Sequence, residues 1–271
     1  MRESSIGVFD SGIGGLTVVH ELFEQLPNER IVYFGDTARV PYGSKSVEII
    51  RRYASEDTEL LLQHNPSLIV VACNTVSAVA LDVVKATAGD IPVIGMIGPA
   101  CIEAVATTIN SRIGIIGTQA TVSSNAYDKG IIAISSGKNI QTFSQACPLF
   151  VPLAEEGWQD HRAAKLIVEE YLRPLKKAGV DTLILGCTHY PVLSKVIGDY
   201  MGTDVKLINS GAVAARKVKE QKRNATGNAA PDHLFLVSDI PSKFQSVGER
   251  FLGYKLPITK QVIFKEAWVV V

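Results

Sequence analysis

Short apolar runs that end in polar or glycine-containing turns recur along the chain. They occupy residues 6–10, 31–35, 68–72, 91–96, 112–117, 140–143, 183–185, 205–208 and 233–237. Several are followed by stretches of helical periodicity, such as residues 16–26 and 46–63. Short, almost continuously apolar runs are typical of strands buried on both faces of a parallel sheet. The alternation of strands and helices therefore predicts an α/β protein with mainly parallel sheets.

The pattern begins again near Gly98-Pro99, with a polar first turn and a later cysteine turn in each half. This repetition predicts two similar α/β domains and suggests an internal duplication. We expect the C-terminal segment to return to the first half. The predicted domains are residues 1–97 together with 208–271, and residues 98–207.

The amino-acid composition limits which binding partners and which cellular location we expect for the protein. The 271 residues are 46% hydrophobic, and 27 Lys and Arg balance 27 Asp and Glu. This balance argues against nucleic acid or an anionic membrane as a primary partner. Residues 1–5 lack the apolar core of a signal peptide, and no apolar run approaches membrane-spanning length. We therefore expect a cytoplasmic protein with reduced thiols.

Two of the predicted strands are followed by a polar turn that contains a cysteine. The first gives Ala72-Cys73-Asn74-Thr75 and the second gives Gly186-Cys187-Thr188-His189. Asn74 and Thr75 can cap the helix that follows, and a helix N-terminus favours an anion and lowers the pKa of a thiol. Ligands bind at strand ends of this kind in α/β folds. We therefore expect both thiols to face one substrate.

The other two cysteines, Cys101 and Cys147, lie in no polar turn at a strand end. An isolated cysteine usually packs as a small buried hydrophobe. We assign both to the core.

Asp10 ends the first predicted strand, before the glycine turn at residues 11–15. The turn is similar to a dinucleotide fingerprint, but Thr17 occupies the position of the third glycine. A carboxylate there would also repel a pyrophosphate. Asp10 is better suited to an ammonium group or to proton transfer, and the alternative is a helix-capping aspartate.

The loop at residues 36–44 follows the second predicted strand and is long for a plain connection. Pro41 fixes one backbone angle, while Gly43 and Ser44 offer backbone N–H groups that could hold a carboxylate. The alternative is an ordinary β-turn around Pro41-Tyr42-Gly43.

Three chemistries could use Cys73 and Cys187. Disulfide exchange has no C-x-x-C motif to support it. Zinc could bind Cys73, Cys187 and His189 with one carboxylate, but the spacing matches no familiar ligand pattern. Proton transfer at a carbon acid needs an acid and a base on opposite faces, and two equivalent strand ends would supply them.

Four motifs together resemble those of the bacterial glutamate racemases, within the aspartate/glutamate racemase superfamily. They are Asp10-Ser11-Gly12-Ile13-Gly14-Gly15, Pro41-Tyr42-Gly43-Ser44, Ala72-Cys73-Asn74-Thr75 and Gly186-Cys187-Thr188-His189-Tyr190-Pro191. The resemblance extends from about residue 6 to residue 216. Aspartate and hydantoin racemases share the two-cysteine plan. The resemblance implies two α/β domains with the active site in the cleft between them.

The resemblance also implies an activity: cofactor-independent interconversion of L- and D-glutamate, which supplies D-glutamate for peptidoglycan. Cys73 and Cys187 would alternate as acid and base, with Asp10 and His189 as auxiliary residues and Asp36 and Glu155 linked to the site. The implied substrate contacts are Asp10, Ser11, Tyr42, Gly43, Asn74, Thr75, Thr188 and His189. No metal or cofactor is implied, and we expect a homodimer.

Two alternatives stay open. An aspartate racemase or a related two-cysteine racemase would share every motif, because pocket depth is not visible in a sequence. A non-catalytic dicarboxylate-binding protein would leave the paired cysteine turns unexplained. The chain also departs from many relatives, which carry an acid at the position of Asn209.

Overall fold

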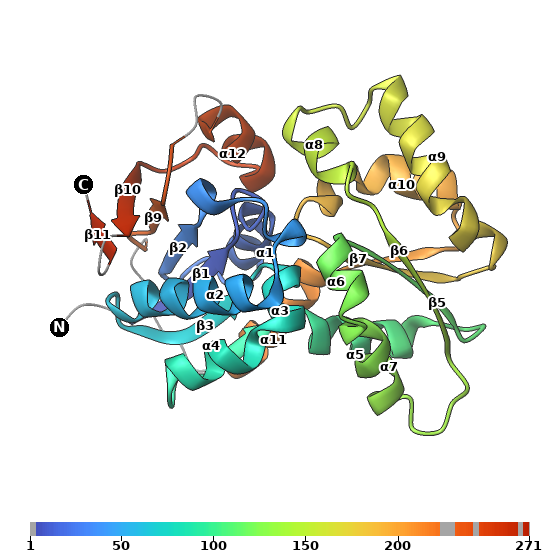
Figure 1. Ribbon diagram of the computed structural model, residues 1–271, viewed down its shortest axis with the longest axis horizontal. Helices are drawn as coiled ribbons and strands as arrows, with labels where there is room; N and C mark the ends of the chain where they lie inside the picture. Colours follow the sequence, from blue (N-terminus) through green and yellow to red (C-terminus); the bar gives the residue numbers. More distant parts are fainter. Residues whose placement is uncertain (1–3, 223–230, 241–243, 265–267, 271) are drawn as a thin grey trace.

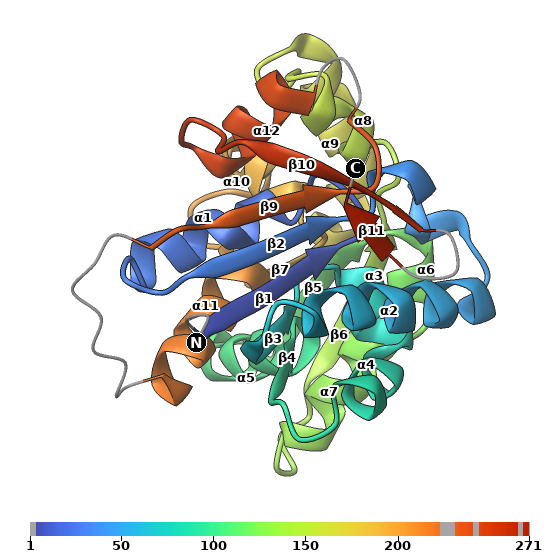
Figure 2. The same cartoon turned by 90° about the vertical axis from the view of Figure 1, so that its left-hand side faces the viewer.

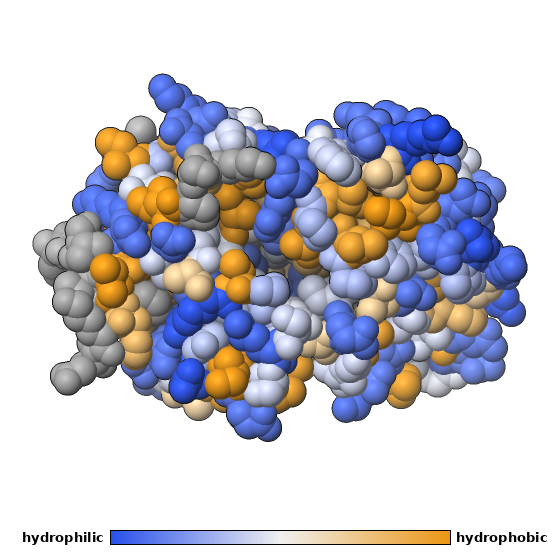
Figure 3. Space-filling view, turned by 45° about the horizontal axis from the view of Figure 1, so that its top comes forward, coloured by the Kyte–Doolittle hydropathy of each residue, from blue (hydrophilic) through white to orange (hydrophobic). Residues whose placement is uncertain are grey.

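The computed structural model describes residues 4–222, 231–240, 244–264 and 268–270. The chain forms two α/β units side by side (Figure 1). In the space-filling view the surface is indented along the boundary between them (Figure 3). Among the described residues, no helix is both long and apolar enough to cross a bilayer.

The first unit is built on a sheet that has seven strands within the described residues, in the order β11-β10-β9-β2-β1-β3-β4. Neighbouring strands are parallel except β11, which pairs antiparallel with β10 at the edge. The strands are β1 (Ser5–Asp10), β2 (Ile31–Gly35), β3 (Pro66–Val71), β4 (Val93–Gly95), β9 (Leu234–Val237), β10 (Thr259–Phe264) and β11 (Trp268–Val270).

The second unit has a four-stranded parallel sheet in the order β6-β5-β7-β8, again counted over the described part of the chain. Its strands are β5 (Arg112–Gly117), β6 (Gln141–Ala146), β7 (Thr182–Gly186) and β8 (Lys206–Asn209). This order repeats the β2-β1-β3-β4 part of the first sheet. The expected fold class, two similar α/β units with mainly parallel sheets, is confirmed.

Helices cover both faces of the sheets, as a parallel sheet requires. They are α1 (Leu16–Gln25), α2 (Val47–Leu62), α3 (Asn74–Val79), α4 (Leu81–Ala88), α5 (Ile97–Thr107), α6 (Gln119–Ser123), α7 (Ala126–Ile134), α8 (Phe150–Glu155), α9 (Arg162–Lys177), α10 (Ser194–Met201), α11 (Ser210–Gln221) and α12 (Phe244–Leu252), with short 3-10 turns η1 (Thr37–Arg39), η2 (Tyr42–Ser44) and η3 (Tyr190–Leu193).

Strand β1 shows how the sequence pattern produces this layering. Ile6 and Val8 point into the apolar cluster that contains α1, whereas Phe9 points into the cluster beneath α2. Side chains alternate along a strand, so a strand apolar at both sets of positions must be covered on both faces. Figure 2 shows β1, β2 and β9 running side by side between these helices.

The expected domain division at 207/208 falls inside β8, because Lys206 to Asn209 all pair with β7. We therefore propose that the chain leaves the second unit after Asn209. The strands β9 and β10 then join the first sheet beside β2. The first domain would thus be discontinuous, with its second part beginning slightly later than the sequence predicts.

The two units are joined by an apolar cluster and by polar contacts. The cluster that contains Ile6 also contains Leu183 of the second sheet. The hydroxyl of Thr17 on α1 donates to the carbonyl of Thr188 at 2.8 Å. On the same side, Nδ2 of Asn209 donates to Oε1 of Glu21 at 3.0 Å.

Asn209 also caps α11, because its Oδ1 accepts from the backbone N–H groups of Gly211 and Ala212. An aspartate could cap the helix equally well. It could not donate to Glu21, and it would place a second carboxylate beside that residue. The asparagine at this position therefore joins α1 to the start of α11 by a hydrogen bond, where an acid would give repulsion.

Gly14 is the closest point of approach between the first glycine turn and the second cysteine turn. A Cβ at this position would lie 2.3 Å from Oγ1 of Thr188 and 2.5 Å from the His189 ring. Both neighbours are buried. Any side chain at Gly14 must therefore push the two units apart or displace His189.

We predict that Gly14→Ala lowers the free energy of unfolding by about 1–3 kcal/mol, the usual cost of overpacking, and also lowers activity. Gly98→Ala is the matched control, because a Cβ at Gly98 in α5 meets nothing within 4 Å. Urea unfolding and initial rates of racemisation measure the two effects. Equal behaviour of the two variants would contradict the close approach.

Candidate active site

The candidate site lies at the carboxyl ends of the central strands in both sheets. In each sheet the chain order reverses between two neighbouring strands, β1 and β3 in the first and β5 and β7 in the second. Ligands bind at such switch points in open α/β sheets. Asp10 ends β1, and Cys73 follows β3 by two residues. Thr118 follows β5, and Cys187 follows β7.

Cys73 is 4% exposed and occupies the N-cap position of α3. Its Sγ lies 3.5 Å from Oγ of Ser11 in the glycine turn. Burial, together with the negative charge of Asp10, raises the pKa of Cys73 to about 12. The expectation that the helix N-terminus lowers this pKa is therefore wrong for Cys73, because desolvation outweighs the helix N–H groups.

The expectation that Asn74 and Thr75 cap this helix is also wrong. Cys73 is the N-cap residue, and the other two side chains bond to the second unit instead. Asn74 contacts Ser210 and Tyr127, whose hydroxyl donates to Asn74 Oδ1 at 2.5 Å.

Thr75 joins a cluster of three hydroxyl groups. Its Oγ1 lies 3.0 Å from Oγ1 of Thr118 and 3.3 Å from Oγ1 of Thr121, and these two lie 3.0 Å from each other. Thr118 and Thr121 were missed as site residues in the sequence. The available signal was their polar turn at the end of an apolar strand, the same signal that singles out Asp10.

Cys187 is 6% exposed and lies beside an imidazole-carboxylate pair. Its Sγ is 3.8 Å from Nδ1 of His189, and Nε2 of His189 is 2.9 Å from Oε1 of Glu155 on α8. Burial lowers the pKa of His189, but the hydrogen bonds and charges of Cys187 and Glu155 outweigh it and raise the pKa to about 10. His189 is therefore a cation at neutral pH, in contact with the sulfur of Cys187.

Asp10 is fully buried between these two environments. Its Oδ2 accepts from the backbone N–H of Gly12 at 3.0 Å, while Oδ1 makes no hydrogen bond within the described part of the chain. Burial raises the pKa of Asp10, and the positive charge of His189 opposes this shift. A carboxylate oxygen left unsatisfied in a buried position is suited to a cationic group of a ligand.

Asp36 and Tyr42 belong to a separate buried network. Arg39 donates to Asp36 at 2.5 Å and to Asp57 at 2.9 Å, and the Tyr42 hydroxyl bonds to both carboxylates. Burial and the charge of Asp36 raise the pKa of Asp57 well above its usual range. Asp36 and the phenol of Tyr42 therefore hold the loop in place, and Tyr42 packs in the same apolar cluster as Cys73.

Gly43 lies at the junction of the two units. A Cβ there would come within 2.8 Å of Cβ of Thr118. The loop backbone at Tyr42 and Gly43 thus closes against α6 of the second unit, next to the three hydroxyl groups.

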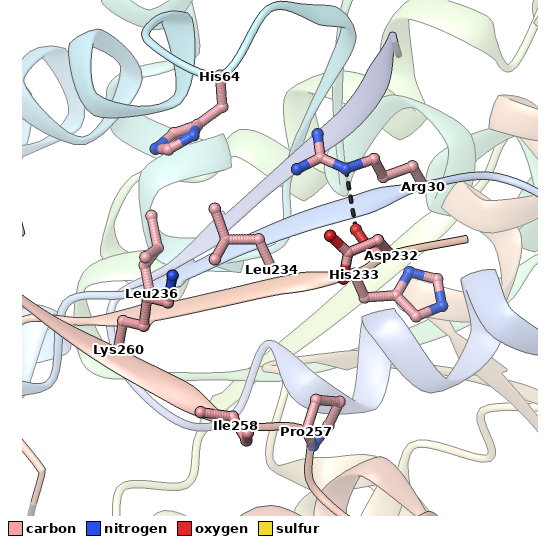
Figure 4. A pocket seen from close by; sticks show the side chains of 9 residues that line it. All are labelled: Arg30, His64, Asp232, His233, Leu234, Leu236, Pro257, Ile258 and Lys260. Atoms are coloured by element: carbon pink, nitrogen blue, oxygen red, sulfur yellow. Dashed lines mark hydrogen bonds between the residues drawn. The ribbon is translucent and has the colours of Figure 1, made fainter. Parts of the chain in front are cut away.

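A cavity of about 580 Å³ lies elsewhere, at the amino ends of β2, β9 and β10 (Figure 4). Its lining includes Arg30, His64, Leu234 and Lys260. It belongs to the opposite edge of the sheet from the cysteine turns. Among the described residues, no three His, Cys, Asp or Glu side chains are arranged to hold a metal ion.

Comparisons with known proteins show the family to which the chain belongs. Residues 6–218 match the family described as Asp/Glu/Hydantoin racemase. A glutamate racemase of Chlorobaculum tepidum is 54% identical over 94% of both chains. The crystal structure of a Francisella tularensis glutamate racemase in complex with D-glutamate superimposes with a TM-score of 0.88, at 40% identity over 98% of both chains.

A second solved structure, a Thermus thermophilus glutamate racemase in complex with β-chloro-D-alanine, superimposes with a TM-score of 0.85. It is 39% identical, over 98% of this chain and 99% of that one. Sequence and structure thus agree over nearly the whole length of the chain. The chain belongs to the Asp/Glu/Hydantoin racemase family.

Proposed function

We propose that this protein is a glutamate racemase that works without a cofactor, using Cys73 and Cys187 as two opposed acid-base groups. The observation that carries the proposal is the pair of cysteine turns at equivalent strand ends, in opposite electrostatic surroundings. The pKa of Cys73 is raised to about 12, so this thiol holds its proton. Sγ of Cys187 lies 3.8 Å from Nδ1 of His189, whose pKa is raised to about 10.

This arrangement supports a specific first step with L-glutamate. The Cys187 thiolate removes the proton from the α-carbon, so that the C–H bond breaks and an S–H bond forms. The Cys73 thiol then gives its proton to the opposite face of the carbanion, which forms the C–H bond of D-glutamate. The assignment of Cys187 to the L-face follows the family resemblance, and the contact of its sulfur with His189 supports it.

Asp10 and His189 would each act on the thiol on their own side of the site. Asp10 raises the pKa of Cys73 through its negative charge, and its unpaired Oδ1 would accept the substrate ammonium. His189, held by Glu155, supports the thiolate of Cys187. Asp36 would act at a distance, through the buried network that holds the Tyr42-Gly43 loop.

Hydrogen-bond donors around the thiols would bind the two carboxylates of glutamate. They are Ser11, Asn74, Thr75, Thr118, Thr121 and Thr188, with the backbone of Tyr42 and Gly43. The D-glutamate bound by the Francisella relative supports this substrate. Circular dichroism of L-glutamate and of L-aspartate incubated with the enzyme separates glutamate from aspartate as the preferred substrate.

The cellular setting is inferred from the family resemblance. We propose that the protein is a cytoplasmic homodimer and that its D-glutamate enters peptidoglycan. The four cysteines are free thiols, as expected in a reducing compartment. Light scattering would determine the oligomeric state.

We predict that Cys73→Ser and Cys187→Ser each reduce racemisation by about 10²–10⁴-fold, the range for loss of a general acid or base. Elimination of chloride from β-chloroalanine needs only proton removal from one face. The α-proton passes to the thiolate, chloride leaves, and the aminoacrylate hydrolyses to pyruvate and ammonium. Cys73→Ser should therefore still eliminate from the L-isomer. Cys187→Ser should still eliminate from the D-isomer, but more slowly and at a rate that rises with pH, because Cys73 must first lose its proton.

Pyruvate release from each isomer measures this directly. Cys101→Ser is the control, since Cys101 is equally buried but lies in the core of the second unit. If both active-site variants lost elimination equally toward both isomers, the thiols would act as one unit on one face.

The pH dependence of kcat/KM should reflect the loss of the proton from His189. Because its pKa is raised to about 10, His189 carries its positive charge below that pH and loses it above. We therefore predict that kcat/KM for L-glutamate falls as pH rises through about 10. His189→Asn should lower kcat/KM by about 10–100-fold, the cost of one hydrogen bond to a charged group, and remove this alkaline limb.

His161→Asn is the matched control, because His161 caps α9 at the surface and asparagine also caps helices. Its profile should coincide with that of the wild type. An alkaline limb near pH 10 that survives in His189→Asn would show that another group is responsible.

A further inference from the structure

Tyr127 on α7 touches the structural supports of both cysteine turns. Its side chain is 1% exposed. A Cβ at Gly186 would lie 3.0 Å from Cε2 of the Tyr127 ring and 2.5 Å from the carbonyl oxygen of Ile116. The ring thus fills the space beside Gly186, the residue immediately before Cys187.

The hydroxyl of the same residue reaches the other cysteine turn. It donates to Oδ1 of Asn74 at 2.5 Å, and Asn74 immediately follows Cys73. Burial raises the pKa of Tyr127 well above its usual value, so the phenol stays a hydrogen-bond donor at any physiological pH.

The direction of the remaining hydrogen bonds is fixed by a backbone carbonyl. Ser210 Oγ lies 3.1 Å from the carbonyl oxygen of Leu185, which can only accept, so the serine hydroxyl donates its one proton there. The serine oxygen must then accept from Nδ2 of Asn74, 3.4 Å away. The amide oxygen of Asn74 is therefore directed to Tyr127, and its nitrogen to Ser210.

One of the two amide protons of Asn74 is not used by these hydrogen bonds. The amide nitrogen has two protons, and within the described residues only the bond to Ser210 uses one of them. An amide held on both sides, with one N–H left over beside the reactive thiol, is suited to an anionic oxygen of the substrate.

We propose that Tyr127, together with Ser210, is a positioning residue that fixes the amide of Asn74 so that its remaining N–H meets a carboxylate of glutamate. The inference rests on the proposed role of Asn74 as a substrate contact. Tyr127 belongs to a helix of the second unit and Ser210 begins α11, directly after β8 of the second sheet, whereas Asn74 follows a strand of the first sheet. The substrate contact beside Cys73 is thus set correctly only when the two units are packed together.

A double-mutant cycle tests the proposal. Tyr127→Phe keeps the ring against Gly186 and removes only the hydroxyl. The KM for L-glutamate should rise about three- to tenfold, the range for one neutral hydrogen bond, with kcat within about twofold. In an Asn74→Ala background the same change should alter KM by less than about twofold, because Tyr127 acts through Asn74.

Ser210→Ala is the second variant and should show the same pattern, a higher KM that disappears in the Asn74→Ala background. Tyr190→Phe is the control. It removes an equally buried hydroxyl of the second unit, which donates to the carbonyl of Cys147 and not to Asn74. Its thermal stability should fall as in Tyr127→Phe, while its KM stays at the wild-type value.

Three results would overturn the inference. If Asn74→Ala raised KM but Tyr127→Phe and Ser210→Ala did not, the positioning role would be wrong and the substrate contact would stand. If Asn74→Ala itself left KM unchanged, the proposed substrate contact would be wrong, and the positioning role with it. A KM effect of Tyr127→Phe that persisted in the Asn74→Ala background would show a general structural effect instead.

Discussion

The order of the parallel strands is the constraint on which the candidate site depends. The first sheet contains the order β2-β1-β3-β4 and the second has the order β6-β5-β7-β8. In each, the chain adds its second strand on one side of its first strand and then crosses to the other side. In both sheets the cysteine turn follows the strand on one side of that crossing. Because the strands are parallel, all of these turns lie at carboxyl edges. Gly14 then lets the two edges meet, since only a missing side chain fits against Thr188 and His189.

Burial gives the two equivalent cysteines unequal surroundings. Cys73 lies beside the carboxylate of Asp10 and keeps its proton, whereas Cys187 lies beside His189, whose charged form is stabilised by Glu155. The charges of Asp10 and His189 also act on each other across the boundary between the units. The two thiols therefore have different neighbours before substrate binds, a carboxylate on one side and an imidazole on the other. The proposed reaction uses both the equivalent positions of the two cysteines in their sheets and the opposite charges of the residues beside them.

Much of this could be predicted from local sequence. The apolar runs predicted β1 to β9, whereas β10 (Thr259–Phe264) matches none of them. The placement of Asp10, Cys73 and Cys187 at strand ends follows from period and turn residues alone. The contacts of Asn74 and Thr75 could not be predicted, because their partners are Tyr127, Thr118 and Ser210, far away in the chain. The pKa of Cys73 was predicted in the wrong direction because a helix N-terminus is visible in a sequence and desolvation is not.

Asp36 and Tyr42 show the same limit. The resemblance implies a substrate contact for Tyr42 and a link to the site for Asp36, and Arg39 and Asp57 hold both side chains in a buried network. The proposed mechanism depends instead on two opposed thiols. Its most direct test is racemisation of L-glutamate in D₂O, with a metal chelator present and without pyridoxal phosphate. Deuterium is measured at the α-carbon of both isomers at low conversion. Two opposed thiols should give D-glutamate that carries one solvent deuterium, while the remaining L-glutamate keeps its proton. Deuterium entering both isomers at equal rates, or D-glutamate that retains the original proton, would contradict this account.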